Sequence, residues 1–143
     1  MKQDGRTTAS ALLDAPTPGG YVLESEYYLV EHAPIEESSA GTLIIEARRH
    51  LLDFGDMTRA ESDEFGSILH RLVPAIKAVT SVERVYSFAI MEHAAHFHLW
   101  LIPRKIDSAL RGPAYLMQQP PLSTTFNDAE AMAKKIRAGF EVA

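Results

Sequence analysis

The stretch that decides the fold is HFHLWLIPR, residues 96–104. Successive side chains of a β-strand point to opposite faces of the sheet. His96, His98, Trp100 and Ile102 are therefore expected on one face, and the three apolar side chains between them on the other. The alternation predicts a strand over residues 96–102 that buries one face in the core and presents two imidazoles on the other.

Two imidazoles on one strand face have three physical explanations. A neutral imidazole is a good nucleophile toward phosphorus when a neighbouring group fixes its tautomer. A His-x-His pair also suits zinc or a similar ion when a third ligand arrives from elsewhere, and His93 or His50 are the candidates. The third explanation is structural, with both rings hydrogen-bonded on a half-buried face and chemically inert. The strand alone leaves all three open.

The segments around this strand predict an α+β domain. Short alternating strands are expected at residues 21–24, 26–31 and 42–47. A long helix begins at Thr58, where Thr58 and Glu61 form a capping box, and apolar residues from 65 to 76 follow at helical spacing. Strands at 83–91 and 96–102 are close enough to form an antiparallel hairpin, and a last helix is expected at 128–138.

Composition bounds the class of protein. The chain has 143 residues, which we divide into a flexible N-terminal arm, 1–20, and a single domain, 21–143. A net charge of −5 without any Lys/Arg run argues against binding to nucleic acid polymers or to anionic membranes. No apolar run has the length of a membrane helix, and no cysteine is present. We expect a cytoplasmic protein.

The order of these landmarks resembles the histidine triad (HIT) superfamily. HAAHFHLWLIPR, residues 93–104, is similar to the family's His-φ-His-φ-His-φ-φ signature, in which φ is apolar, and to its Pro-Arg continuation. Upstream, GTLIIEARRH, residues 41–50, is similar to the family's glycine-led strand, which runs into two basic residues and a histidine before a Thr-capped helix. The resemblance covers about residues 21–104.

The resemblance implies a HIT-like fold, an antiparallel sheet of about five strands flanked by one long and one C-terminal helix, and usually a homodimer. Members of the family bind small-molecule nucleotides. They hydrolyse nucleotides or transfer nucleotidyl groups through a nucleotidyl-histidine intermediate. By position, the nucleophile falls on His98, an orienting role on His96, and the acidic ribose-binding residue on Glu31. We expect no cofactor and no metal ion.

Three positions depart from the family pattern. Trp100 stands at the third motif position, where the family has a histidine or, in the galactose-1-phosphate uridylyltransferase branch, a glutamine. An indole N–H donates a hydrogen bond but supplies no acidic proton. Thr42 stands where many members have another active-site histidine, and His93 lies in an altered loop before the motif, where it is a candidate substitute. We assign Trp100, Thr42 and His93, together with Glu31, to substrate binding.

The leading hypothesis is a nucleotide-binding phosphohydrolase or nucleotidyl transferase in which His98 attacks the α-phosphate. The alternative is a catalytically degenerate nucleotide-binding protein of the same fold, in which Trp100 has removed the chemistry. A histidine-ligated metal enzyme ranks last, because no carboxylate–histidine cluster of familiar spacing accompanies the pair.

Overall fold

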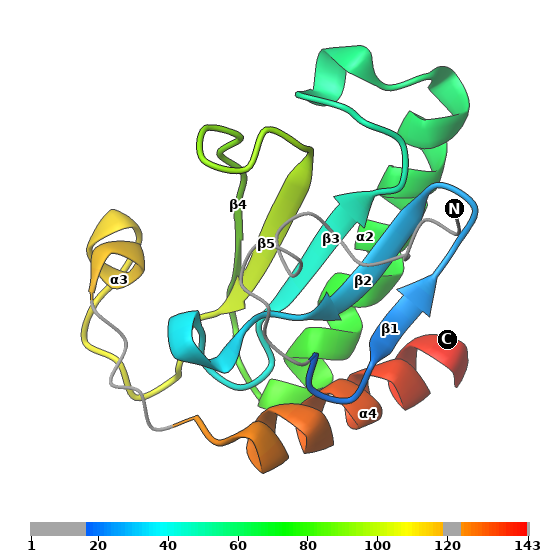
Figure 1. Cartoon of the computed structure of the whole chain (residues 1–143). Helices are drawn as coiled ribbons and strands as arrows, with labels where there is room; N and C mark the ends of the chain where they lie inside the picture. The colour runs from blue at the N-terminus through cyan, green and yellow to red at the C-terminus, as the bar shows by residue number, and fades with distance from the viewer. Residues whose placement is uncertain (1–16, 119–123, 143) are drawn as a thin grey trace.

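A computed structural model of the chain describes residues 17–118 and 124–142 and places them in one α+β unit (Figure 1). The strands form an antiparallel sheet in the order β1-β2-β3-β5-β4. Their bounds are β1 Tyr21–Glu24, β2 Tyr28–His32, β3 Leu43–Ala47, β4 Val85–Phe88 and β5 His98–Pro103. The helices are α2 Arg59–Thr80, α3 Pro113–Met117 and α4 Phe126–Val142, with short 3-10 turns η1 Ile35–Glu37 and η2 Phe54–Asp56.

The predicted five-stranded sheet with a long and a C-terminal helix is confirmed, with shifts at the element ends. β5 begins at His98 rather than at His96, because the Phe97 N–H bonds outside the sheet and donates to the Leu51 carbonyl at 2.7 Å. β4 is shorter than predicted, and α4 begins earlier and ends later. The one-turn helix α3 was not predicted.

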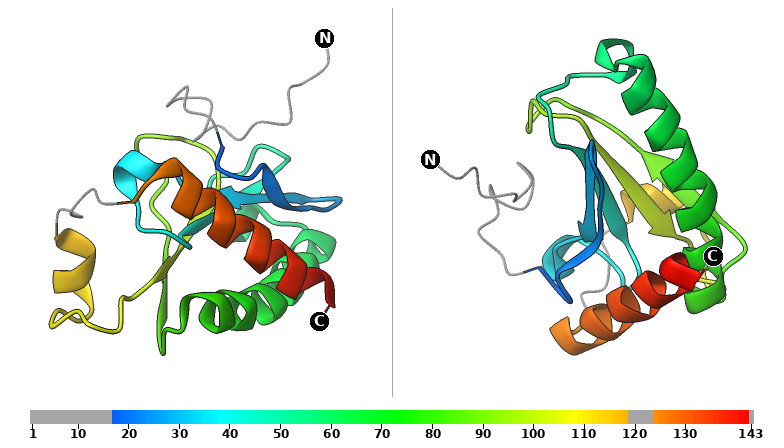
Figure 2. Two further views of the ribbon diagram at one scale, coloured as in Figure 1. Left: turned by 90° about the horizontal axis from the view of Figure 1, so that it is seen from below. Right: turned by 90° about the vertical axis from the view of Figure 1, so that its right-hand side faces the viewer.

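The core lies between one face of the sheet and the two long helices. α2 contacts β4 and β5, α4 contacts β1 and β2, and Figure 2 shows both helices on the same side of the sheet. Each fully buried aliphatic side chain stabilises the fold by about 1.5–3 kcal/mol. The core side chains at 5% exposure or less include Tyr28, Val30, Leu43, Ile45, Leu99 and Leu101 of the sheet and Leu72, Ile76, Ala133 and Ile136 of the helices.

The predicted capping box at the start of α2 is confirmed. The Thr58 hydroxyl accepts from the Glu61 N–H at 3.1 Å, and the Glu61 carboxylate accepts from the Thr58 N–H at 3.2 Å. The Tyr28 hydroxyl donates to the Glu61 carbonyl at 2.9 Å and thereby ties the cap to β2. Burial raises the pKa of Tyr28 to about 12, so this hydroxyl keeps its proton. The helix start is therefore fixed against the sheet.

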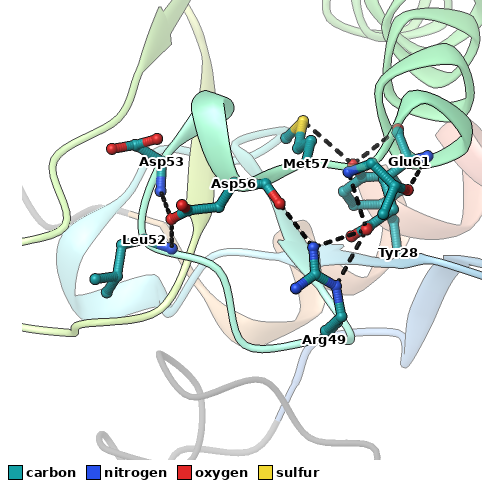
Figure 3. Close-up of polar contacts among 8 residues, drawn as sticks. Tyr28, Arg49, Leu52, Asp53, Asp56, Met57 and Glu61 are labelled. Carbon is teal, nitrogen blue, oxygen red and sulfur yellow. Dashed lines mark hydrogen bonds and ion pairs between the residues drawn. The ribbon is translucent and has the colours of Figure 1, made fainter.

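The loop between β3 and α2 is held by Arg49. Its Nε and Nη2 donate to one Glu61 carboxylate oxygen at 3.1 and 2.9 Å, and Nη2 also donates to the Asp56 carbonyl at 2.7 Å (Figure 3). Burial raises the pKa of Glu61, but the hydrogen bonds from Arg49 and Thr58 outweigh it, so that pKa lies below its ordinary value. This network fixes the loop that carries His50.

Residues 17–20 of the predicted arm pack against α4, whereas residues 1–16 lie outside the described residues. Arg137 of α4 donates from Nε to the Tyr21 carbonyl at 2.9 Å and from Nη2 to the Gly19 carbonyl. Gly19 has a φ of +78°, and a β-carbon there would lie 3.1 Å from the Ala133 side chain. Glycine at 19 thus permits the close approach of this turn to α4.

Candidate functional site

Three of the predicted site residues, Glu31, His98 and Trp100, lie on the face of the sheet opposite α2 and α4, which we call the site face. The register places Leu29, Glu31, Ile44, Glu46, His98 and Trp100 on this face. Glu31 and Glu46 are 1% exposed and His98 is 8% exposed. The alternation of strand side chains thus separates these polar groups from the apolar core on the other face.

His98 is held in one tautomer. Its Nδ1 lies 2.7 Å from the His96 carbonyl oxygen. A carbonyl only accepts, so Nδ1 carries a proton, and in the neutral ring Nε2 has the lone pair. The imidazole is therefore arranged as a nucleophile or a proton acceptor through Nε2.

His96 lies just before β5, and its ring turns toward the end of β3. Its Nε2 donates to the Ala47 carbonyl at 2.5 Å, and its Nδ1 lies 3.5 Å from Nδ1 of His50. The His96 imidazole is thus held by the β3 end and the loop after it. The group of His96 that contacts His98 is its backbone carbonyl, not its side chain.

Glu31 and Trp100 lie in one row across the sheet. Glu31 is the register partner of Ile44, Ile44 of Trp100, and Trp100 of Phe88. Two strand spacings separate Glu31 from Trp100, which is about 9.5 Å. The Glu31 carboxylate accepts a hydrogen bond from the Thr17 hydroxyl at 2.9 Å. The row thus places a buried carboxylate on one side of the site and an indole on the other.

Glu46 is a site-face residue that the sequence reasoning missed. It is the direct register partner of His98 on the neighbouring strand. Side chains directly opposite in an antiparallel pair have β-carbons about 4.5–5.5 Å apart, so Glu46 is nearer in register to His98 than Trp100 is. The signal was available in the sequence: a glutamate inside the apolar strand LIIEA faces the side opposite the core once the strand period is applied.

Thr42 and His93 are placed differently. Thr42 precedes β3, is 1% exposed, and shares a 3.2 Å hydrogen bond between its hydroxyl and that of Ser39. It lines a cavity together with Trp100. His93 is exposed in the loop between β4 and β5, and no hydrogen bond among the described residues joins it to the other site residues. The structure therefore brings Thr42 next to Trp100 and leaves His93 apart.

His32 has a structural role that the sequence did not predict. Its Nδ1 donates to the Ala33 carbonyl at 2.7 Å, and its Nε2 accepts from the Gly41 N–H at 2.9 Å. Burial lowers the pKa of His32, although the hydrogen bond to Ala33 acts in the other direction. The neutral ring closes the connection that leads from Glu31 to Thr42.

The part of the chain that the structure describes contains no group of three or more His, Asp or Glu side chains placed to hold a metal ion. His50 and His96 approach each other, with ring centroids 5.6 Å apart.

In the same part of the chain, no helix has the length and apolar character needed to cross a membrane.

Comparison with solved structures identifies the architecture. A histidine triad protein from Bradyrhizobium japonicum superposes with a TM-score of 0.72 over 92% of this chain and 95% of that chain, at 16% identity. The chain has the histidine triad fold. A Zn-bound histidine triad family protein from Mycobacterium smegmatis has a TM-score of 0.66 at 18% identity, covering 94% of this chain and 91% of that one.

A hypothetical histidine triad nucleotide-binding protein from Sulfolobus tokodaii is also similar, with a TM-score of 0.65 and 14% identity over 94% of this chain and 91% of that chain. Comparison with protein-family models and with curated proteins gave no match. The histidine triad likeness therefore lies in the fold.

Proposed function

We propose that the protein is a nucleotide-binding phosphohydrolase or nucleotidyl transferase in which His98 forms a nucleotidyl-histidine intermediate. The observation that carries the proposal is the 2.7 Å hydrogen bond from His98 Nδ1–H to the His96 carbonyl, which leaves the Nε2 lone pair for attack on phosphorus. Attack would form an N–P bond as the leaving group departs, and water would then release the nucleotide and restore His98.

The surrounding residues support this assignment by their positions. Glu31 lies in the row next to that of His98, two strands away, where a carboxylate can accept from ribose hydroxyls. His96 would orient His98 through its carbonyl, Trp100 would bound the phosphate region, and Thr42 would lie beyond it. His93 is the least supported of the proposed binding residues. Positioning and electrostatic stabilisation would supply most of the rate, as in phosphoryl transfer generally.

The same proposal includes a homodimer. β4 is an edge strand of the sheet, and an edge presents unpaired backbone groups that can pair with another chain. Phe88 on this strand is 40% exposed, and Ile90 just after it is 51% exposed. Exposed apolar side chains on an unpaired edge favour a second copy at this edge. Light scattering of the purified chain measures the mass directly.

The absence of cysteine is consistent with the proposed cytoplasmic location.

The test is intact-protein mass spectrometry after incubation with adenosine and guanosine phosphoramidates and dinucleoside polyphosphates. We expect a nucleotidyl adduct or free mononucleotide with the wild-type protein and neither with His98→Ala. His70→Ala is the matched control, because that histidine is exposed on α2, which covers the other face of the sheet, and it should retain turnover. Turnover that persists in a folded His98→Ala protein would overturn the mechanism.

A second candidate function is a catalytically degenerate nucleotide-binding protein. Trp100 favours it, because an indole at the third motif position has no acidic proton for the leaving group. General acid assistance typically contributes a factor of about 10²–10⁴, so its loss alone can abolish useful turnover. Stabilisation of the wild-type protein by a nucleotide in a thermal shift assay, without adduct or product, would select this function.

A further inference from the structure

We propose that Glu46 is the general base that accepts a proton from the water that hydrolyses the nucleotidyl-histidine intermediate at His98. Glu46 would act in the second step of the proposed function, on which this inference rests. It is a β3 residue on the site face and the direct register partner of His98 on β5. The hydrophobic core lies on the other face of the sheet, so Glu46 has no part in it.

The backbone pairing holds Glu46 and His98 close together. Opposite residues of an antiparallel ladder alternate between pairs that exchange hydrogen bonds and pairs that do not, and the side chains of the second kind are closer. The Ala47 N–H donates to the Phe97 carbonyl at 3.3 Å, so these two residues belong to the hydrogen-bonded kind. Glu46 and His98, one position along, are therefore a non-hydrogen-bonded pair, with α-carbons about 4.5 Å apart.

Among the described residues that neighbour His98 on the site face by register, Glu46 is the one with a side chain that accepts protons. The other neighbours are Ile44, Trp100 and Phe88. Aliphatic and phenyl groups have no acceptor atom, and an indole N–H only donates. Glu31 lies a further strand away on β2, where its carboxylate is assigned to the ribose. Position in the sheet thus selects Glu46.

The surroundings of Glu46 would suit an aliphatic side chain. Glu46 is 1% exposed, and its neighbours Leu29 on β2 and Ile44 on β3 are apolar and buried. Taking a carboxyl group out of water costs free energy that an aliphatic side chain would not cost. A carboxylate kept at such a position, directly opposite a reactive histidine, is typical of a general base in a catalytic site.

The second step needs a base that the first step does not. In the first step the Nε2 lone pair of His98 attacks phosphorus, while Nδ1–H stays bonded to the His96 carbonyl. Both ring nitrogens of the intermediate then carry a substituent, so the ring is positively charged and has no lone pair left to activate water. A carboxylate beside the ring balances that charge and can take the proton.

The step balances with water as the co-reactant. The water oxygen forms a bond to phosphorus while the Glu46 carboxylate takes one of its protons. The bond between phosphorus and Nε2 breaks, and its electron pair returns to Nε2, so His98 is neutral again. The nucleoside monophosphate leaves, and the protonated Glu46 releases its proton to solvent.

The experiment follows both steps with the p-nitrophenyl ester of AMP, whose leaving group departs without a proton. In Glu46→Gln we expect a burst of one p-nitrophenolate per site, then steady release slower than in the wild type by about 10²–10⁴-fold. Intact-protein mass spectrometry should show the adenylyl group accumulating on this variant. Glu141→Gln is the matched control, because Glu141 is exposed on α4, on the other side of the sheet, and should leave steady release unchanged.

Steady release from folded Glu46→Gln within a few-fold of the wild type would overturn the inference. Loss of the burst together with steady release would also overturn it, because a merely structural role slows both steps. Glu46→Asp keeps a carboxylate and should release p-nitrophenolate faster in the steady state than Glu46→Gln; equal rates would count against a base.

If Glu46→Gln does not fold, Glu46→Met takes its place with the same expectations, because its side chain is similar in length and apolar like its neighbours. Failure of the proposed function gives a different result. The wild-type protein then forms neither adduct nor p-nitrophenolate, which overturns the nucleophilic role of His98 and the role of Glu46 with it.

Discussion

Replacing Trp100 by histidine tests whether the proposed active site lacks only a proton donor. Position 100 lies two residues after His98 on the same face, at about 6.8 Å along the strand. An imidazole there is within reach of a leaving atom on a phosphorus held at His98 Nε2. Protonated imidazole is an effective general acid near neutral pH, and such assistance is typically worth about 10²–10⁴ in rate.

The rate increase expected for Trp100→His should depend on the leaving group. Amines and alkoxides need a proton as they depart, whereas p-nitrophenolate does not. We expect Trp100→His to raise kcat for an adenosine 5′-alkylphosphoramidate by about 10²-fold or more and to leave the p-nitrophenyl ester of AMP within a few-fold of wild type. Single-turnover hydrolysis of both substrates measures the two rates. The added rate should fall as pH rises through the titration of the new histidine.

Trp100→Leu is the control, because it removes the indole and opens comparable space without supplying an acid. Both variants remove a half-buried aromatic side chain and are expected to lose about 1–3 kcal/mol of unfolding free energy, so folding is checked by circular dichroism. Equal rates for Trp100→His and Trp100→Leu on the phosphoramidate would refute the reasoning. In that case the effect of Trp100 on turnover is steric, and the third motif position is not where the proton is supplied.

Three further changes test the residues around the site. Glu31→Gln should weaken binding of ribonucleotides, measured by calorimetry, by about 10–100-fold, because a hydrogen bond to a charged acceptor is worth about 1.5–3 kcal/mol. Binding of 2′,3′-dideoxynucleotides, measured by the same calorimetry, should change little. Equal losses of affinity for both ligands would argue against a ribose contact. The depressed pKa of Glu61 means that its contribution to stability is present above its unfolded pKa and lost as pH falls through its folded pKa. Glu61→Gln, which weakens the bond to Arg49, should therefore lower the unfolding free energy at neutral pH and reduce its decline in acid, as measured by urea denaturation; a decline as steep as in the wild type would contradict this. His32→Leu leaves the buried Gly41 N–H without its acceptor and should cost about 1–3 kcal/mol in the same assay. The His32 pKa is also depressed, so the stability that the neutral His32 ring contributes is lost as pH falls. The difference in unfolding free energy between His32→Leu and the wild type should therefore shrink in acid.

The elements whose pattern is local could be predicted from the sequence. Thr58 and Glu61 signal a helix start through two reciprocal hydrogen bonds, and the structure has both. The antiparallel pairing of β4 and β5 was predicted from two apolar segments close together in the sequence, and the structure has it, although the connection, residues 89–97, is longer than predicted. The start of β5 could not be predicted, because Phe97 bonds to Leu51, and such a contact depends on how a distant loop folds.

The candidate site could be predicted only in part for the same reason. Strand period places His98 and Trp100 on one face, but register decides what lies opposite them, and register between β3 and β5 is set by tertiary packing. Glu46 was therefore missed, although its partner is His98. α3 was not predicted, because a single helical turn has no periodic pattern. For the same reason the sequence did not indicate that Tyr115 of this helix lines the cavity next to Trp100.

Trp100 is the only tryptophan in the chain, and its position gives the protein a built-in optical reporter. Its indole lies next to His98 along β5 and on the wall of the cavity, so its fluorescence reports on both parts of the site. A ligand bound at His98 or in the cavity would change the polarity or the stacking around this one fluorophore. Occupancy can therefore be titrated with unlabelled compounds, and mixing in a stopped-flow instrument follows their entry and release in real time.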